Sequence, residues 1–398
     1  MSSPGIGMFY RIRRIVLLAA FFALVPALCT SAGWSQSRPN PPKEGGQEPS
    51  PAEAGGPQGD IGPLAVPRKK DEAPPPPPKA KAPEGMPNFS ISVDVPLVTV
   101  PVSVTTKDGQ FIPGLKKENF RLTEDGVPQN ISGVTQAEAP ITAVLVVEFA
   151  ANSYAFMYDA LNASYAFANS LKKDDWVAVV SFDIRPKIVV DFTQDKGAVQ
   201  AGLNTLRIPG FNEVNVNDAL YDTLNRVAGV EGRKYIILVT SGCDTFSRTN
   251  FDKLMQKVKQ SQNTIVYPIS TGKAMLVWLG ANGQGVEPGL FPCSTEMDFA
   301  QADARLKSIA KTTGGRWFGP RFEAEMPEIF GSIAAEIRNE YVITYRPTNT
   351  KQDGSYRKLK VELVAPDGKP IVVKDQKGKD VKYIVFAREG YTAKNAVE

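Results

Sequence analysis

Histidine is absent from the 398-residue chain. Its absence excludes Ser-His-Asp and Cys-His nucleophile systems, the usual zinc sites, and acid–base catalysis by an imidazole. An enzyme built from this sequence would have to use carboxylates, lysine or a metal ion held by oxygen atoms. Since the chain also has no recognisable nucleophile motif, the sequence favours a protein that is not an enzyme.

Cysteine and net charge are also scarce. The three cysteines, Cys29, Cys243 and Cys293, are too few and too scattered for a zinc cluster. The formal net charge is +4, and removal of residues 1–32, with three arginines and no acid, lowers it by three to +1. A net charge so close to zero does not indicate binding to nucleic acid.

The first segment has the pattern of a secretory signal peptide. Three arginines at positions 11–14 precede an apolar stretch over 15–28, and small residues follow up to Ala32. We expect cleavage after Ala32, which makes the protein exported, to the periplasm or the extracellular space. The alternatives are a retained membrane anchor and lipidation of Cys29. Either way, the membrane is reached only through this segment or a tether.

Residues 33–88 are predicted to be a disordered linker. Nearly half of the chain's 32 prolines lie here, together with two glycine pairs. Such a composition cannot bury enough apolar surface to fold, and the run of prolines at 74–78 favours an extended spacer.

Both flanks of the remaining chain predict strands. Apolar and polar residues alternate over 89–95, 97–105 and 120–127, and again over 341–345, 358–364 and 381–387. Neither flank is large enough for a core of its own. We therefore expect one β-sandwich made of residues 89–139 and 341–398, with another domain inserted between them.

The middle region, 140–340, alternates between strands and helices. The uncharged run 141–147 is typical of a strand that is covered on both faces. Repeated βα units predict an α/β fold with a doubly wound, mostly parallel sheet. The glycine-rich segment 272–299 interrupts the alternation and is predicted to be irregular. We expect helices over 154–170, 196–206, 216–230, 251–262, 303–312 and 323–339, and further strands over 176–182, 187–192, 235–240, 264–269 and 316–318.

Three of the loops that connect these elements are predicted to lie at the carboxyl edge of the sheet. Open α/β folds bind their ligands at this edge. Here the sequence resembles the von Willebrand factor type A domain, in the right order over roughly 140–340. The matching pieces are the strand 144–147, the helix start at 218–222, and the strand 236–240 with its loop 241–245. The flanks, at 124–129 and 387–391, resemble an exported bacterial subfamily of the acidobacterial type.

The resemblance implies a metal-ion-dependent adhesion site, in which oxygen ligands from an Asp-x-Ser-x-Ser loop, a Thr and an Asp hold a Mg²⁺-type cation. This chain departs from that pattern at every position. Glu148 replaces the first Asp, Ala150 and Asn152 replace the serines, Asp218 (or Asn217) replaces the threonine, and Ser241 replaces the last Asp. We expect a degenerate site and no cofactor. The alternative keeps Mg²⁺ or Ca²⁺ on Glu148, Asn152, Asp218, Ser241 and Asp244.

The loop face is then expected to bind a protein partner without a metal. Tyr154, Phe211 and Trp278 are candidate contacts, although packing within the protein explains them equally well. The predicted function is a secreted cell-envelope interaction or adhesion module. Two alternatives are a metal-dependent adhesin with an altered cation site and an envelope hydrolase that uses Asp218, Asp222 and Asp244.

Cys243 and Cys293 are the two cysteines left after export. In an oxidising compartment such a pair is expected to form a disulfide, which would fasten the 272–299 segment over the loop edge. The alternative is two free thiols that lie too far apart to bridge.

Overall fold

The computed structural model describes residues 97–136, 139–151, 154–281, 293, 295–365, 367–374 and 380–395, with the backbone alone at 154–159, 278–279, 281 and 374. The expected signal peptide, linker and strand 89–95 lie outside the described residues. No helix in the described part of the chain is long and apolar enough to cross a membrane.

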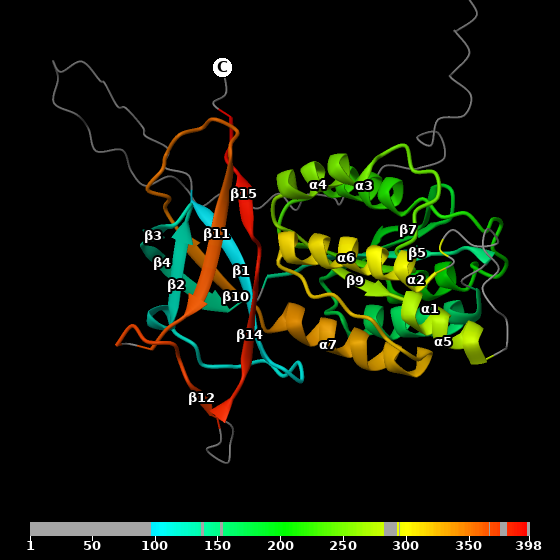
Figure 1. Cartoon of the computed structure of the whole chain (residues 1–398), viewed down its shortest axis with the longest axis horizontal. Coiled ribbons are helices and arrows are strands. Elements are labelled where there is room, and N and C mark those ends of the chain that lie inside the picture. Colours follow the sequence, from blue (N-terminus) through cyan, green and yellow to red (C-terminus); the bar gives the residue numbers. More distant parts are fainter. Residues whose placement is uncertain are drawn as a thin grey trace, which may run out of the picture. The chain divides into compact units, whose positions relative to one another are not determined.

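Strands from the two flanks form a β-sandwich (Figure 1). Each sheet combines strands from both flanks, and the apolar side chains between the sheets form one core. The turn between β2 and β3 is Asp125-Gly126, and both residues have positive φ, as this two-residue hairpin requires. The first sheet has the order β14 (Tyr383–Ala387), β1 (Val98–Thr106), β10 (Tyr341–Tyr345) and β4 (Ile131–Gln136), and the second the order β15 (Gly390–Thr392), β11 (Tyr356–Leu363), β2 (Phe120–Glu124) and β3 (Val127–Gln129).

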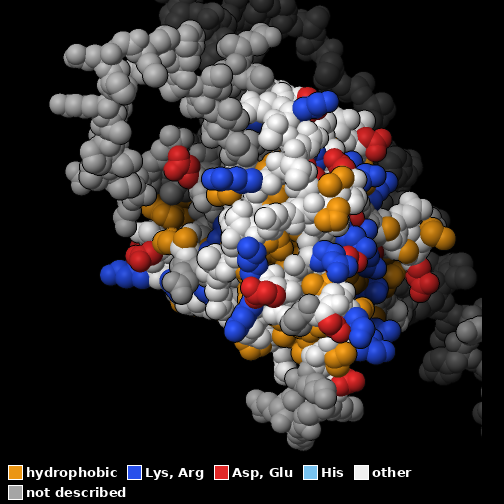
Figure 2. Space-filling model, turned by 90° about the vertical axis from the view of Figure 1, so that its left-hand side faces the viewer, with side chains coloured by type: hydrophobic (Ala, Val, Ile, Leu, Met, Phe, Trp, Pro, Cys, Tyr) orange, Lys and Arg blue, Asp and Glu red, His pale blue; other side chains and the backbone are white. Residues whose placement is uncertain are grey.

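Smaller elements border the sandwich: the 3-10 turn η1 (Lys117–Asn119) and the short pair β12 (Val373–Lys374) and β13 (Asp380–Val381). Figure 2 views the sandwich end of the protein, where basic, acidic and hydrophobic side chains are intermixed.

The inserted domain has a five-stranded sheet in the order β7 (Pro186–Thr193), β6 (Trp176–Phe182), β5 (Thr142–Glu148), β8 (Lys234–Thr240) and β9 (Thr264–Ser270). Only β7, at one edge, is antiparallel to its neighbour. The predicted fold class, a doubly wound and mostly parallel sheet inserted in a β-sandwich, is confirmed.

Two helical layers cover this sheet (Figure 1). Alternate residues of β5 belong to different cores: Ala143, Leu145 and Val147 to one, Val144 and Val146 to the other. This explains why the run carries no charge and does not alternate between apolar and polar residues. The first layer contains α1 (Tyr154–Ser170), α2 (Lys196–Leu203) and α7 (Met326–Arg338), and the second contains α3 (Val216–Val227), α4 (Phe251–Gln260) and α6 (Glu296–Thr313).

The prediction for segment 272–299 is partly wrong. Residues Gly272–Ala281 form helix α5, and α6 begins at Glu296. The Thr295 hydroxyl accepts the Asp298 amide and the Asp298 carboxylate accepts the Thr295 amide, so this helix starts with a capping box. Thr295 and Asp298 have the spacing of that motif in the sequence, and the signal was overlooked. The remaining short turn, η3 (Glu323–Glu325), precedes α7.

Two partly buried ion pairs join the connections that lead into and out of the inserted domain. The Arg233 guanidinium donates to the Ala139 carbonyl (3.1 Å) on the first connection and pairs with Glu340 (3.2 Å) on the second. Asp175 accepts the Ile141 amide at 3.0 Å and pairs with Arg338 at the end of α7. The two connections therefore lie side by side at the amino-terminal edge of the sheet.

Glu340 is almost fully buried, and the Tyr235 hydroxyl donates to its carboxylate at 2.7 Å. Burial raises the pKa of Glu340 to about 7, and this effect outweighs the hydrogen bond from Tyr235 and the attraction of Arg233. A raised carboxyl pKa means that the folded state holds the proton more tightly than the unfolded chain. The contribution of Glu340 to stability is therefore fully present below pH 4.5, the ordinary value, and is lost as the pH rises through 7.

We predict that Glu340→Gln removes this pH dependence, because glutamine resembles the protonated carboxyl. The free energy of unfolding of the unmodified chain should fall by about 3 kcal/mol at most between pH 4.5 and pH 8 through this group. Urea denaturation of both proteins across this range measures the difference. Parallel pH curves for the variant and the unmodified chain would contradict the assignment.

Candidate functional site: the loop edge of the α/β domain

Backbone hydrogen bonds bring three loops together at the carboxyl edge of the sheet. The Ala151 amide, after β5, donates to the Phe211 carbonyl at 2.8 Å. The Thr245 amide, after β8, donates to the Val214 carbonyl at 2.7 Å. Because each bond joins loops that are distant in sequence, the three loops form one connected surface. We call this surface, made of residues 149–151, 204–218 and 241–250, the loop edge.

Glu148 lies at the end of β5 and is 4% exposed. Val147 pairs with Val239 of β8, so Glu148 lies beside Thr240. Glu148 Oε2 accepts hydrogen bonds from the Thr240 hydroxyl (2.6 Å), the Ser241 amide (2.8 Å) and the Ser241 hydroxyl (2.9 Å). Hydrogen bonds to a carboxylate are strong because the acceptor is charged. The protein thus stabilises this buried negative charge with its own donors.

Asp218, in the first turn of α3, binds the loop after β8. Its two carboxylate oxygens accept the amides of Thr249 (2.8 Å) and Arg248 (2.9 Å). The Asp218 amide in turn donates to the Ser247 hydroxyl at 3.2 Å. The carboxylate therefore fixes the conformation of the loop that follows β8.

Asp244, in the loop after β8, in turn accepts a hydrogen bond from helix α3. Its Oδ1 accepts the Asn217 amide at 3.1 Å and the Ser247 hydroxyl at 2.6 Å. The Asn215 side chain also connects these loops. Its amide donates to the Ile184 carbonyl and its oxygen accepts the Phe246 amide, both at 2.9 Å. Sequence reasoning missed Thr240, Asn215 and Ser247. Only the strand register could have indicated Thr240, as the neighbour of Glu148 across the sheet.

The predicted metal ligands are thus engaged with the protein itself. Glu148, Asp218 and Asp244 accept donors from neighbouring loops, and Ala150 has no side-chain ligand atom. Among the described residues, no group of three or more His, Cys, Asp or Glu side chains is placed to hold a metal ion. Asn152 lies outside the described residues.

Apolar side chains are exposed on the same loops. Ile208, Phe211 and Phe246 are 87%, 53% and 66% exposed. Phe211 was a predicted partner contact, whereas Ile208 and Phe246 were not identified from the sequence. The structure does not describe the side chains of Tyr154, at the start of α1, and Trp278, in α5.

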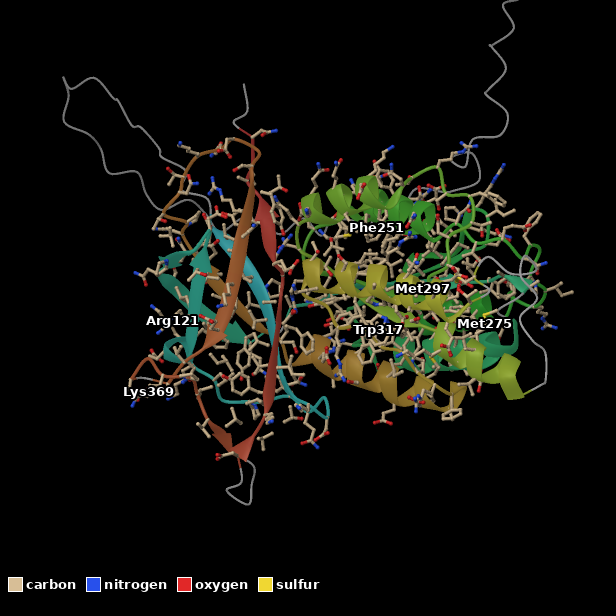
Figure 3. The ribbon with its side chains drawn as sticks, viewed as in Figure 1. Arg121, Phe251, Met275, Met297, Trp317 and Lys369 are labelled. Carbon is tan, nitrogen blue, oxygen red and sulfur yellow. A yellow bond between two sulfur atoms is a disulfide. The ribbon has the colours of Figure 1, made fainter. Side chains whose placement is uncertain are left out.

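Cys243 and Cys293 form a disulfide. It joins the loop after β8 to the residues before α6, as the sequence predicted, and lies in a small apolar cluster with Ala274, Met275 and Phe299. Figure 3 shows Met275 on α5 and the exposed Met297 at the start of α6. The disulfide therefore fastens α5 and α6 beside the loop edge.

The chain was compared with known proteins, and several solved structures are similar to it. The chain is similar to a von Willebrand factor type A protein from Catenulispora acidiphila, at 13% identity and a TM-score of 0.40, over 72% of this chain and 76% of that one. It is similar to the vWF domain of the type V pili tip protein Mfa5 from Porphyromonas gingivalis, at 15% identity and a TM-score of 0.32, over 50% and 95% of the two chains.

A third similar structure is the PilB minor pilin from Streptococcus sanguinis, at 12% identity and a TM-score of 0.38. The match covers 51% of this chain and 62% of the pilin, which is less than two thirds of the pilin's length. No family model and no curated protein matches the chain.

We predict that Glu148→Ala destabilises the protein by about 3–5 kcal/mol, because three buried donors lose their charged acceptor. Glu148→Gln, which retains an acceptor oxygen, should cost less. Urea denaturation measures both values. If Glu148→Ala were as stable as the unmodified chain, the carboxylate would not be what fixes Thr240 and Ser241.

We predict that replacing both cysteines by serine lowers stability by about 4 kcal/mol at most, the chain-entropy value for a loop of 50 residues. Reduction of the unmodified chain should lower its melting temperature to that of the double variant. The double variant itself should not respond to reductant, and a response would point to an effect elsewhere in the chain.

Proposed function

We propose that this protein is an exported cell-envelope module that binds a protein partner through the loop edge, without a metal ion and without catalysing a reaction. The observation that carries the proposal is the exposure of Ile208, Phe211 and Phe246 on loops that hydrogen bonds hold in place. Protein interfaces are enriched in aromatic side chains, phenylalanine among them. Loops that are already ordered lose less entropy when a partner binds.

Independence from metal is supported by the hydrogen bonds of the carboxylates. Glu148 Oε2 already accepts three hydrogen bonds, so a cation on that oxygen would displace donors of Thr240 or Ser241. Each released donor would then need another acceptor, since a buried donor without one costs about 1–3 kcal/mol. These competing contacts favour a site that works without Mg²⁺ or Ca²⁺.

Export is proposed from the basic and apolar pattern of residues 1–32. The disulfide is consistent with that proposal, because disulfides persist in oxidising compartments. The adhesion role and the exported bacterial subfamily are proposed from the sequence resemblance to von Willebrand factor type A proteins.

The hydrolase alternative receives no specific support. Asp222 pairs with Arg226 one helical turn away at 2.5 Å. Asp218 and Asp244 accept loop donors. All three carboxylates thus have structural contacts that explain their presence.

The experiment uses the full chain as bait for cell-envelope extract, followed by affinity measurement with the captured protein. Phe211→Ala combined with Phe246→Ala should weaken binding by about tenfold or more, because two exposed aromatic contacts are lost. Val127→Ala is the matched control, since Val127 is 52% exposed but lies on the β2–β3 hairpin. Equal affinity of the double variant and the control would rule out the loop edge as the binding surface.

The same measurement tests the metal. Addition of EDTA or Mg²⁺ should leave the affinity unchanged. Loss of binding in EDTA, together with saturable heat on titration with Mg²⁺ that disappears in Asp218→Ala, would establish the altered cation site instead.

A further inference from the structure

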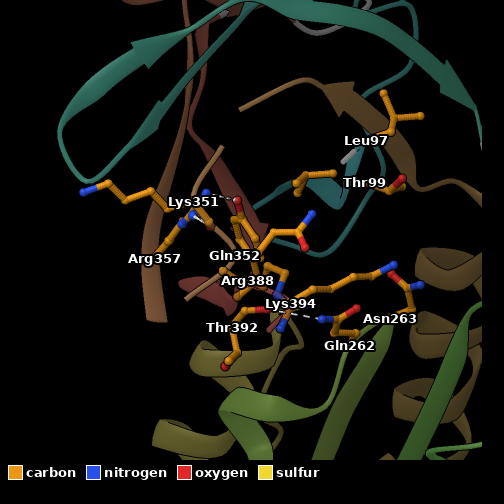
Figure 4. A pocket seen from close by; sticks show the side chains of 13 residues that line it. Leu97, Thr99, Gln262, Asn263, Lys351, Gln352, Arg357, Arg388, Thr392 and Lys394 are labelled. Atoms are coloured by element: carbon orange, nitrogen blue, oxygen red, sulfur yellow. Dashed lines mark hydrogen bonds between the residues drawn. The ribbon is translucent and has the colours of Figure 1, made fainter. Parts of the chain in front are cut away.

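A pocket of about 240 Å³ lies on the opposite side of the α/β domain from the loop edge, where the domain meets the β-sandwich (Figure 4). Residues of the α4–β9 turn, of the β10–β11 loop and of strands β11 and β15 line it. Hydrogen bonds across the junction frame it: the Gln262 side chain donates to the Thr392 carbonyl at 3.2 Å. The pocket is therefore built from both domains.

The charged residues that line this pocket are all basic: Lys351, Arg357, Arg388 and Lys394. Arg357 is compensated, because its guanidinium pairs with the buried Glu124 at 3.5 Å. Within the part of the chain that the structure describes, Lys351, Arg388 and Lys394 have no carboxylate partner. The pocket thus presents three uncompensated positive charges. The neighbouring sandwich surface, in contrast, mixes both signs (Figure 2).

The nearest acidic residues along the chain are directed to other contacts. Asp353 accepts the Ser355 amide (3.0 Å) and hydroxyl (2.6 Å). Glu389 pairs with Lys311 at 2.6 Å. Neither residue lines the pocket.

Among the basic residues of this pocket, Arg388 is the buried charge that lacks a carboxylate partner in the described part of the chain. It is 7% exposed, and among the residues that the structure describes its guanidinium donates only to backbone carbonyls, of Gly390 at 2.6 Å and of Ser261 at 3.4 Å. Burial lowers the pKa of Arg388, which shows the cost of holding this charge away from water. A buried charge without a counter-ion is unfavourable, and an anion beside it would recover part of that cost.

We propose that this pocket binds a phosphate group, carried as a monoester dianion by a small molecule or by a lipid headgroup. Three positive charges balance a dianion better than the single charge of a carboxylate. Arg388 would contact the phosphate at the base of the pocket, and the exposed Lys351 and Lys394 would close over it from the rim. The side chains of Asn263 and Gln352 supply neutral donors for the remaining oxygens.

The test is a calorimetric titration of the full chain with inorganic phosphate and with glycerol phosphate, compared with acetate. The variant combines Lys351→Glu with Lys394→Glu, because both lysines are exposed and their reversal leaves the fold intact. Binding of phosphate should be saturable in the unmodified chain and at least tenfold weaker in the double variant. Lys173→Glu, an exposed lysine on the loop before β6, is the matched control and should bind normally.

Three results would overturn the proposal: no saturable heat with phosphate, equal affinity in the double variant, or acetate binding as tightly as phosphate. Sedimentation with vesicles of phosphatidic acid, against phosphatidylcholine, identifies the source. Binding to phosphatidic acid that the double variant lacks indicates a lipid headgroup. Phosphate binding without vesicle binding indicates a soluble ester. This site is independent of the loop edge, so its failure leaves the proposed function unaffected.

Discussion

The contacts of Arg233 impose the constraint on which the arrangement of this protein depends. One guanidinium holds the Ala139 carbonyl, before the inserted domain, and the Glu340 carboxylate, after it. Asp175 repeats the link between Ile141 and Arg338. Because both connections are fixed at the amino-terminal edge of the sheet, the sandwich adjoins that edge. The carboxyl edge, with its loops, remains clear of it.

The carboxylates of the predicted cation site accept hydrogen bonds from other parts of the protein. A metal ion would gather carboxylates from separate loops around one charge. Here the same purpose is served by direct hydrogen bonds: Glu148 joins β5 to β8, while Asp218 and Asp244 join α3 to the loop after β8. The apolar side chains of Phe211 and Phe246 are exposed on loops that these hydrogen bonds join.

The sequence predicted those features that arise from local pattern. The uncharged run 141–147, for example, indicated a strand buried on both faces. Glycine content concealed helix α5, although its apolar residues pack against the disulfide and Phe299. The Glu148–Thr240 contact could not be read from the chain, because it depends on the parallel register of strands separated by 92 residues. The contact between Arg388 and Ser261 could not be predicted either, because it joins segments that are 127 residues apart in the chain.

The two edges of the inserted sheet therefore differ in chemistry because they differ in how their charges are satisfied. At the carboxyl edge every described carboxylate of the predicted site accepts protein donors, and apolar side chains are exposed on the same loops. At the amino-terminal edge, the buried Arg388 donates to carbonyl groups that carry no net charge. A carbonyl satisfies the hydrogen bond of a guanidinium but not its charge. That difference is the basis for proposing a protein partner at the first edge and an anion at the second.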